Sequence, residues 1–310
     1  MKRIQLDMTM NWKRAGLIAL LSALPAVAAA QDYAVRLPQI DTTVALEKEG
    51  TVDLTIISGR IRVLGWDRQD VKISARIDRG YVKMDAGMSR VRLSVEGDRG
   101  RAGEAIFEVS VPRGSRVVMN STSGDLFASG TRGEVNAESV SGDIDVSDVR
   151  RRLSAESVSG SQHIANVVGD VRSEAVSGRI EMENIAGDIE AETVSGRVVM
   201  LDIKSKFVKA GSVSGRVAFA GPIDPAGRYE FESHSGSIRL AVPENTGALL
   251  RVETFSGHVE SDFPVTLQPN RSTQNRFEFQ IGNGRARITA ESFSGSINII
   301  RGTSRDISGE

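Results

Sequence analysis

Cysteine is absent from the 310 residues, and large aromatic side chains are few: two tryptophans, three tyrosines and ten phenylalanines. The lack of cysteine excludes a small protein held together by disulfides. An excess of one charge is also missing, because 39 Lys+Arg face 40 Asp+Glu. That balance excludes a disordered polyelectrolyte and a strongly basic nucleic-acid binder. A hydrophobic share of 40% with 31 glycines favours a globular chain with a thin, repetitive β core.

Long apolar runs are missing as well, so the sequence predicts no transmembrane helix. The first thirty residues have the features of a secretory signal peptide instead. Lys13 and Arg14 precede an apolar run over residues 15–24, and small residues occupy positions 28–30. We expect cleavage after Ala30 and a periplasmic or secreted mature protein.

Internal repetition is the dominant pattern of the remaining chain. Ser-Gly recurs at steps of 18 residues from Gly124 to Gly196 and at longer steps beyond. The repeat glycines are Gly124, Gly142, Gly160, Gly178, Gly196, Gly215, Gly236, Gly257 and Gly295. We expect each of them to permit a tight corner, and the serines before them to bind turn backbone rather than act as nucleophiles.

Apolar residues follow the same repeat at a half-period of nine. Pairs such as Leu126 and Ala128, or Ile144 and Val146, alternate as in a short strand with one inward face. A helix does not fit, because nine residues rotate a 3.6-residue helix by half a turn. A third apolar column is expected to fill the corners: Val140, Val149, Val158, Val167, Val176, Ile185, Val194 and Ile203. The sequence therefore predicts an all-β fold, a single-stranded parallel β-solenoid (β-helix) with about 18 residues per coil and each coil paired with the next.

The two ends of the chain differ from the middle. Residues 31–118 carry longer alternating runs and are expected to form an N-terminal β section that caps the stack. The solenoid repeats are expected over 119–300, with an irregular insertion at 260–288 that holds prolines and a glycine-rich turn. Residues 301–310 form a polar tail.

Several ordered motifs resemble the bacterial putative-adhesin family of β-strand repeat domains, a domain of unknown function. They are Gly65-Trp66-Asp67, FEVSVPRG at 107–114 leading into Ser123-Gly124-Asp125, the reiterated SVSG units, and IGNG at 281–284 followed by ESFSGSI. The resemblance spans roughly residues 45–300. It implies a β-repeat fold and an exported, adhesin-like protein.

A column of glutamates lies four residues before the repeat glycines, and we name it the acidic ladder. Its members are Glu138, Glu156, Glu174 and Glu192, then, after Gly211, Glu232, Glu253 and Glu291. Like charges about 4.8 Å apart repel, so the ladder must face solvent. It is either a solubilising face or a comb of carboxylates for cations or a basic partner. The calcium-roll signature is absent and the histidines occupy different phases of the repeat, so no metal or other cofactor is expected.

Three arginines directly follow successive repeat glycines: Arg179, Arg197 and Arg216. This arginine strip, roughly 10 Å long, matches phosphate or carboxylate groups along an anionic polymer. The alternative is that its guanidinium groups pair with Glu174 and Glu192. The strip is the ligand surface that the sequence favours, and its expected partners are envelope polysaccharide, lipopolysaccharide or another envelope protein.

The sequence thus indicates an exported, non-enzymatic module that presents a repetitive charged surface, with no catalytic residues. One alternative is a self-assembling envelope scaffold, which would need uncapped terminal coils. Another is a β-helix carbohydrate-active enzyme with Asp125 and Asp143 as its acids. Aromatic sugar platforms are scarce, however, since Trp66 is the only tryptophan after the signal peptide.

Overall fold

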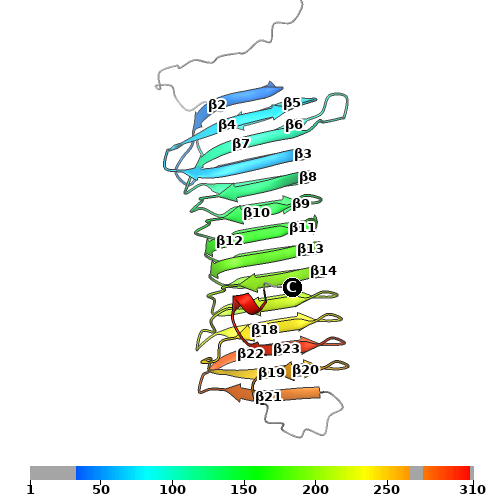
Figure 1. Ribbon diagram of the computed structural model, residues 1–310. Coiled ribbons are helices and arrows are strands. Elements are labelled where there is room, and N and C mark those ends of the chain that lie inside the picture. The colour runs from blue at the N-terminus through cyan, green and yellow to red at the C-terminus, as the bar shows by residue number, and fades with distance from the viewer. Residues whose placement is uncertain (1–32, 265–274, 308–310) are drawn as a thin grey trace, which may run out of the picture.

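The computed structural model describes residues 33–264 and 275–307, and nearly all regular structure in them is β. The strands form one 23-stranded sheet that winds into an elongated stack, and a short 3-10 turn, η1 (Ser304–Asp306), follows the last strand (Figure 1). The all-β prediction is confirmed. Within the described residues no helix has the length and apolarity needed to cross a membrane. The predicted signal peptide lies outside those residues.

The middle of the stack consists of two parallel ladders of strands. The first ladder contains β9 (Val135–Ser139), β11 (Leu153–Ser159) and β15 (Phe207–Ser212). The second contains β10 (Ile144–Ser147), β12 (Gln162–Val168), β16 (Val217–Ala220) and β18 (Ile238–Val242). Three long strands run through a corner and belong to both ladders: β8 (Arg116–Ser129), β13 (Val171–Ala186) and β14 (Ile189–Leu201).

The repeat length sets the pairing register of these ladders. Leu153 lies opposite Val171, and Ile144 lies opposite Gln162, so partners are one 18-residue repeat apart. Alternate side chains of both ladders then point inward and form one continuous core, because successive residues of a strand face opposite ways. Val149, Val167, Ile185 and Ile203 fill corners of that core, as predicted.

The repeat glycines are required for a different reason than expected. None of those in the regular part, such as Gly160 and Gly178, has a positive φ. A Cβ at Gly178 would instead lie 2.2 Å from the carbonyl oxygen of Gly160 in the preceding coil, and a Cβ at Gly196 would lie 1.9 Å from that of Gly178. Glycine is therefore needed because successive corners stack backbone on backbone.

The N-terminal strands cover one end of the stack (Figure 1). They are β1 (Tyr33–Leu37), β2 (Gln39–Ala45), β3 (Thr51–Trp66), β4 (Asp70–Ile77), β5 (Tyr81–Ala86), β6 (Arg90–Glu96) and β7 (Ala105–Pro112). β3 pairs in parallel with β8, with Gly59 opposite Gly124, and on its other side with β6 and β7. Beyond it the pairing becomes antiparallel, from β7 to β4 to β2 and from β6 to β5 to β1.

The C-terminal coils do not follow chain order, which corrects the expectation that each coil pairs with the next. The strands involved are β17 (Arg228–Ser233), β19 (Ala248–Thr254), β20 (Val259–Ser261), β21 (Asn275–Ile281), β22 (Ala286–Ser292) and β23 (Ile297–Arg301). β22 pairs in parallel with both β17 and β19, and β23 pairs with both β18 and β20. The last coil thus lies between two earlier ones. The other edge of β19 pairs antiparallel with β21, so β19 is paired on both sides.

The described part of the tail folds back onto the stack (Figure 1). Ile307 is buried in a small cluster with Ala218, Ala220 and Ala241, on the outer side of β16 and β18. All four residues of β16 are therefore buried, whereas an uncovered strand would alternate. Of the insertion expected at 260–288, β21 and the start of β22 are regular strands, and 265–274 lies outside the described residues.

Candidate functional site

An exposed apolar column runs along one corner of the stack, two residues before the repeat glycines, and we name it the corner ladder. Its members in spatial order are Val140, Val158, Val176, Val194, Val213, His234, Phe293 and Phe255. The five valines are 48–49% exposed. The expectation that Val140, Val158, Val176 and Val194 fill corners of the core is therefore wrong. Each lies two residues after an outward glutamate, and positions i and i+2 of a strand share a face.

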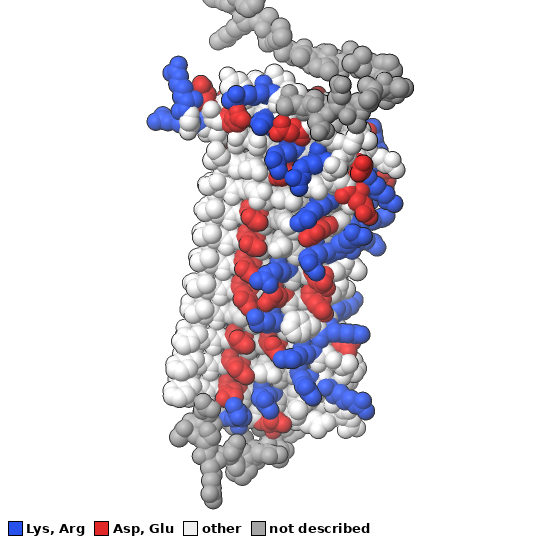
Figure 2. All heavy atoms as spheres, turned by 180° about the vertical axis from the view of Figure 1, so that it is seen from behind, with Lys and Arg blue, Asp and Glu red and all other residues white. Residues whose placement is uncertain are grey.

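The acidic ladder lies beside the corner ladder, on the outer face of the first strand ladder. Glu138, Glu156, Glu174 and Glu192 lie opposite one another on successive strands. Figure 2 shows the acidic column running along the length of the stack beside an uncharged column. The order at the C-terminal end is Glu232, Glu291, Glu253, because β22 lies between β17 and β19.

Basic residues on the same face pair with part of the acidic ladder. Arg172 contacts Glu174 and donates from Nη1 to Glu190 Oε2 at 2.6 Å, and these carboxylates raise the pKa of its guanidinium. Lys209 Nζ lies 2.5 Å from Glu192 Oε1, and this hydrogen bond raises the pKa of the lysine although partial burial opposes it. The partners of Glu174 and Glu192 are therefore Arg172 and Lys209, and the strip residue Arg179 pairs elsewhere.

A groove lies between the two ladders. It consists of hollows of about 580 and 670 Å³, both bordered by Glu192, Thr193 and Val213, so they run into each other. Inward serines and threonines form the floor, among them Ser139, Thr193 and Ser292, which are 4–6% exposed. Their hydroxyl oxygens are buried and have no hydrogen-bond partner within the described residues. The groove therefore has an acidic wall, an apolar wall and a floor of small side chains whose hydroxyl oxygens point into the interior.

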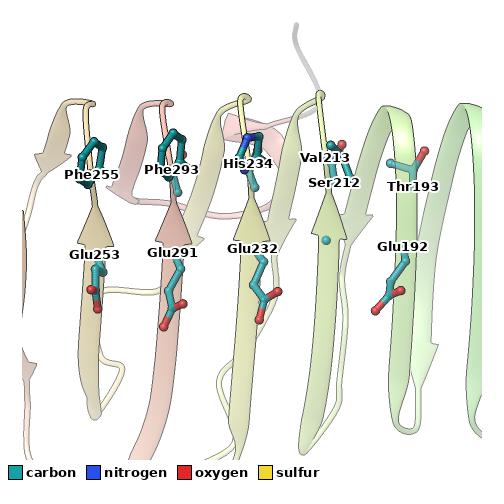
Figure 3. A pocket seen from close by; sticks show the side chains of 13 residues that line it. Glu192, Thr193, Ser212, Val213, Glu232, His234, Glu253, Phe255, Glu291 and Phe293 are labelled. Carbon is teal, nitrogen blue, oxygen red and sulfur yellow. The ribbon is translucent and has the colours of Figure 1, made fainter.

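Aromatic rings replace valine at the C-terminal end of the groove. The Phe293 ring stacks between those of His234, at 4.9 Å between centroids, and Phe255, at 5.0 Å. Figure 3 shows these rings in a row, with the carboxylates of Glu232, Glu291 and Glu253 in a second row beside them. Burial and the adjacent carboxylates raise the pKa of Glu291, and Arg276 and Arg251 oppose that shift.

The arginine strip lies on the other side of the corner, at the start of the second strand ladder. Arg179 lies opposite Arg197, and the N–H of Val198, next to Arg197 in β14, donates to the carbonyl oxygen of Arg216, so the structure brings the three together. Arg179 Nη1 is 2.9 Å from Glu181 Oε1. The strip borders a hollow of about 160 Å³ that is closed on one side by Ile307 of the tail. Ligand binding by the strip stays a prediction.

The acids that a β-helix enzyme would need are occupied with backbone contacts. Asp143 N–H donates to Asp125 Oδ1 at 3.2 Å, and Ser161 N–H donates to Asp143 Oδ1 at 2.8 Å. Each carboxylate thus holds the corner of the next coil. Over the described ranges, no group of three or more His, Asp or Glu residues is arranged to hold a metal ion.

Sequence reasoning missed the corner ladder, although a signal for it was present. The acidic ladder was correctly placed outward, and the residues two positions later, such as Val158 after Glu156, share that face. The same reasoning identifies His234, Phe293 and Phe255 as its members at the C-terminal end.

Comparison with known proteins finds one family model and two solved structures that are similar to this chain. No curated protein matches it. A solved structure described as a putative cell adhesion protein from Clostridium sporogenes ATCC 15579 is 10% identical, with 85% of this chain and 99% of that chain covered and a TM-score of 0.23. A putative lipid binding protein from Parabacteroides distasonis ATCC 8503 is 10% identical, with 84% and 96% covered and a TM-score of 0.47. Residues 200–300 match the family model described as Toastrack DUF4097, a domain of unknown function, and this match confirms the resemblance found in the sequence.

Proposed function

We propose that this protein is an exported, non-enzymatic binding module whose binding surface is the groove between the acidic ladder and the corner ladder. The observation that carries the proposal is the exposed corner ladder. Its apolar side chains are half exposed over many successive coils, and soluble proteins rarely expose a continuous apolar patch without a partner for it.

The regular spacing of the groove suits an elongated partner. In the proposed architecture, a single-stranded parallel β-solenoid with about 18 residues per coil, each coil adds one carboxylate and one apolar group at about 4.8 Å intervals. The 18-residue pairing register of β9 to β14 supports that architecture. Many individually weak contacts would then sum along the partner. An envelope polysaccharide, lipopolysaccharide or an envelope protein has the required length.

The groove is a better binding surface than the arginine strip on two grounds. It extends over more coils, from Val140 to Phe255, whereas the strip occupies three. The strip also borders the folded tail through Ile307, which limits access from that side.

Co-sedimentation of the purified full-length protein with peptidoglycan, outer-membrane vesicles and lipopolysaccharide tests the proposal. The groove variant combines Val140→Ser, Val158→Ser and Val176→Ser, which change exposed side chains and leave the core intact. The matched control combines Arg179→Ala, Arg197→Ala and Arg216→Ala. We expect retention on one fraction, a loss of retention in the groove variant and little change in the control. Retention that depends on the arginines instead would move the site to the strip, and retention on no fraction would contradict an envelope partner.

Export is tested separately by expressing the full-length gene and fractionating the cells. The protein recovered from the periplasm or medium should have a mass that begins at residue 31, after cleavage of the predicted signal peptide. An uncleaved protein confined to the cytoplasm would overturn this part of the proposal.

A further inference from the structure

The C-terminal end of the groove differs from the rest in its aromatic wall and in the glycine that interrupts the acidic ladder, and the inference drawn from it rests on the proposed function. We propose that the hollow beside Glu232, Glu291 and Phe293 binds a basic peptide segment. In this segment a lysine or arginine side chain is flanked by apolar residues.

The carboxylates and the rings come from the same strand ends. Glu232, Glu291 and Glu253 lie near the ends of β17, β22 and β19. His234, Phe293 and Phe255 follow just beyond the ends of the same strands. Because each pair is two residues apart, both side chains face outward, and Figure 3 shows the two rows side by side. A ligand that lies along the stack can therefore touch a carboxylate and a ring at every coil.

Room for a side chain is provided where the acidic ladder is interrupted. Gly211 lies opposite both Glu192 and Glu232 in the pairing register. A Cβ added there would have no neighbour closer than Glu232 O at 3.9 Å, so glycine leaves open space rather than close packing. Gly211 lines the same hollow of about 670 Å³ as Glu232 and Phe293.

The charge of the hollow favours a cation. Glu253 is paired with Arg276, at 2.7 Å between Oε2 and Nη2. Glu232 and Glu291, in contrast, have no ion pair with any described residue. Glu291 also lies between the carboxylates of Glu232 and Glu253. The raised pKa of Glu291 has burial and these neighbouring charges as its causes, and a bound cation would relieve the repulsion. An anionic ligand such as a phosphate would be repelled.

The apolar wall favours a cation that carries hydrocarbon next to its charge. Phe255 and Phe293 are 56% and 50% exposed, and their stacking fixes them without covering them. A hydrated metal ion would leave these rings unused, whereas the methylenes of a lysine and an adjacent apolar side chain would cover them. The three coils span about 10 Å, which is the length of about three residues of extended chain.

Fluorescence polarisation with labelled synthetic peptides on the full-length protein tests the proposal. The probe is a five-residue peptide of alternating Leu and Lys, and the comparison peptides replace Lys by Glu or Leu by Ser. The site variant combines Glu232→Gln and Glu291→Gln, and a second variant is Phe293→Ser. The matched control, Glu138→Gln with Glu156→Gln, removes two unpaired charges from the distant end of the same groove.

We expect the Leu-Lys peptide to bind and both comparison peptides to bind at least about tenfold more weakly, the factor that corresponds to the loss of one or two charge or ring contacts. The site variant and Phe293→Ser should weaken binding by a similar factor, and the control should stay within about twofold. Equal binding of the Leu-Glu peptide, or an equal loss in the control, would overturn the local site. If no peptide binds but the groove variant still abolishes envelope retention, this inference fails and the proposed function stands. If the peptides bind but the protein is retained on no envelope fraction, the proposal of an envelope partner is contradicted instead.

Discussion

The rings of Phe255 and Phe293 stack at 5.0 Å with an interplanar angle of 4°, although the two residues are 38 positions apart in the chain. They meet because β22 occupies the place between β17 and β19. The same placement of β22 puts Glu291 between Glu232 and Glu253. The acidic and aromatic groups at the C-terminal end of the groove are therefore close together.

The position of the Phe293 ring between the rings of His234 and Phe255 predicts that removing Phe293 and removing Phe255 destabilise the protein unequally. Phe293→Ala loses two ring contacts and should lower the free energy of unfolding by about 1–2 kcal/mol, whereas Phe255→Ala loses one and should cost about half of that. Urea unfolding followed by circular dichroism measures both. Val158→Ala, an exposed member of the same ladder, is the control and should stay within about 0.5 kcal/mol. Equal losses for the two phenylalanines would contradict the observed stacking order.

Two glycines on the same side of the stack predict opposite outcomes for one substitution. At Gly178 a Cβ would meet the Gly160 carbonyl oxygen at 2.2 Å, so Gly178→Ala should destabilise the protein by several kcal/mol. At Gly211 there is open space and no positive φ, so Gly211→Ala should be neutral or stabilising by up to about 0.5–1 kcal/mol. Thermal unfolding measures the stability of both variants against the original protein. An unchanged stability of Gly178→Ala would contradict the close stacking of the corners.

The raised pKa of Glu291 predicts a pH-dependent effect of neutralising it. A carboxyl whose pKa is higher in the folded than in the unfolded state destabilises the fold at pH values above its folded pKa. This destabilisation decreases as the pH falls below the folded pKa and is absent below the unfolded pKa. Glu291→Gln should therefore stabilise at pH 7 by about 0.5 kcal/mol, the scale of like charges on adjacent strands. The difference from the original protein should vanish near pH 4. Urea unfolding at both pH values tests this, with the exposed turn residue Glu49→Gln as a control without effect.

Burial of Ile307 predicts that the tail contributes to stability. Ile307→Ser should cost about 1–2 kcal/mol, because it removes a mostly buried side chain from the cluster with Ala218, Ala220 and Ala241. The variant should also be cleaved faster by a protease after residue 301. Val168→Ser, which changes a side chain that is 56% exposed, is the matched control. Unchanged cleavage in Ile307→Ser would show that the tail is not held by this contact.

The repeat pattern was sufficient to predict the β class, the register and the outward acidic ladder. An 18-residue step places Glu156 beside Glu174 whatever the wider architecture, because pairing between identical repeats keeps each residue type in one column. It was not sufficient for the corner valines. Half of that apolar column lies in the core, as Val167 does, and half is exposed, as Val158 is, since the two corners of each coil differ in which way the side chain points.

Periodicity along the chain thus determined the strands, their inward faces and the neighbours of each residue in the regular repeats. Only the tertiary structure decided the order of the last coils, the contact of Ile307 with β16 and β18, and the gathering of Glu232, Glu291 and Glu253 beside three stacked rings. The physical reason is that periodicity is a local property, set by alternation and corner geometry. The place of a coil in the stack depends instead on which strand edges are still unpaired when the chain returns.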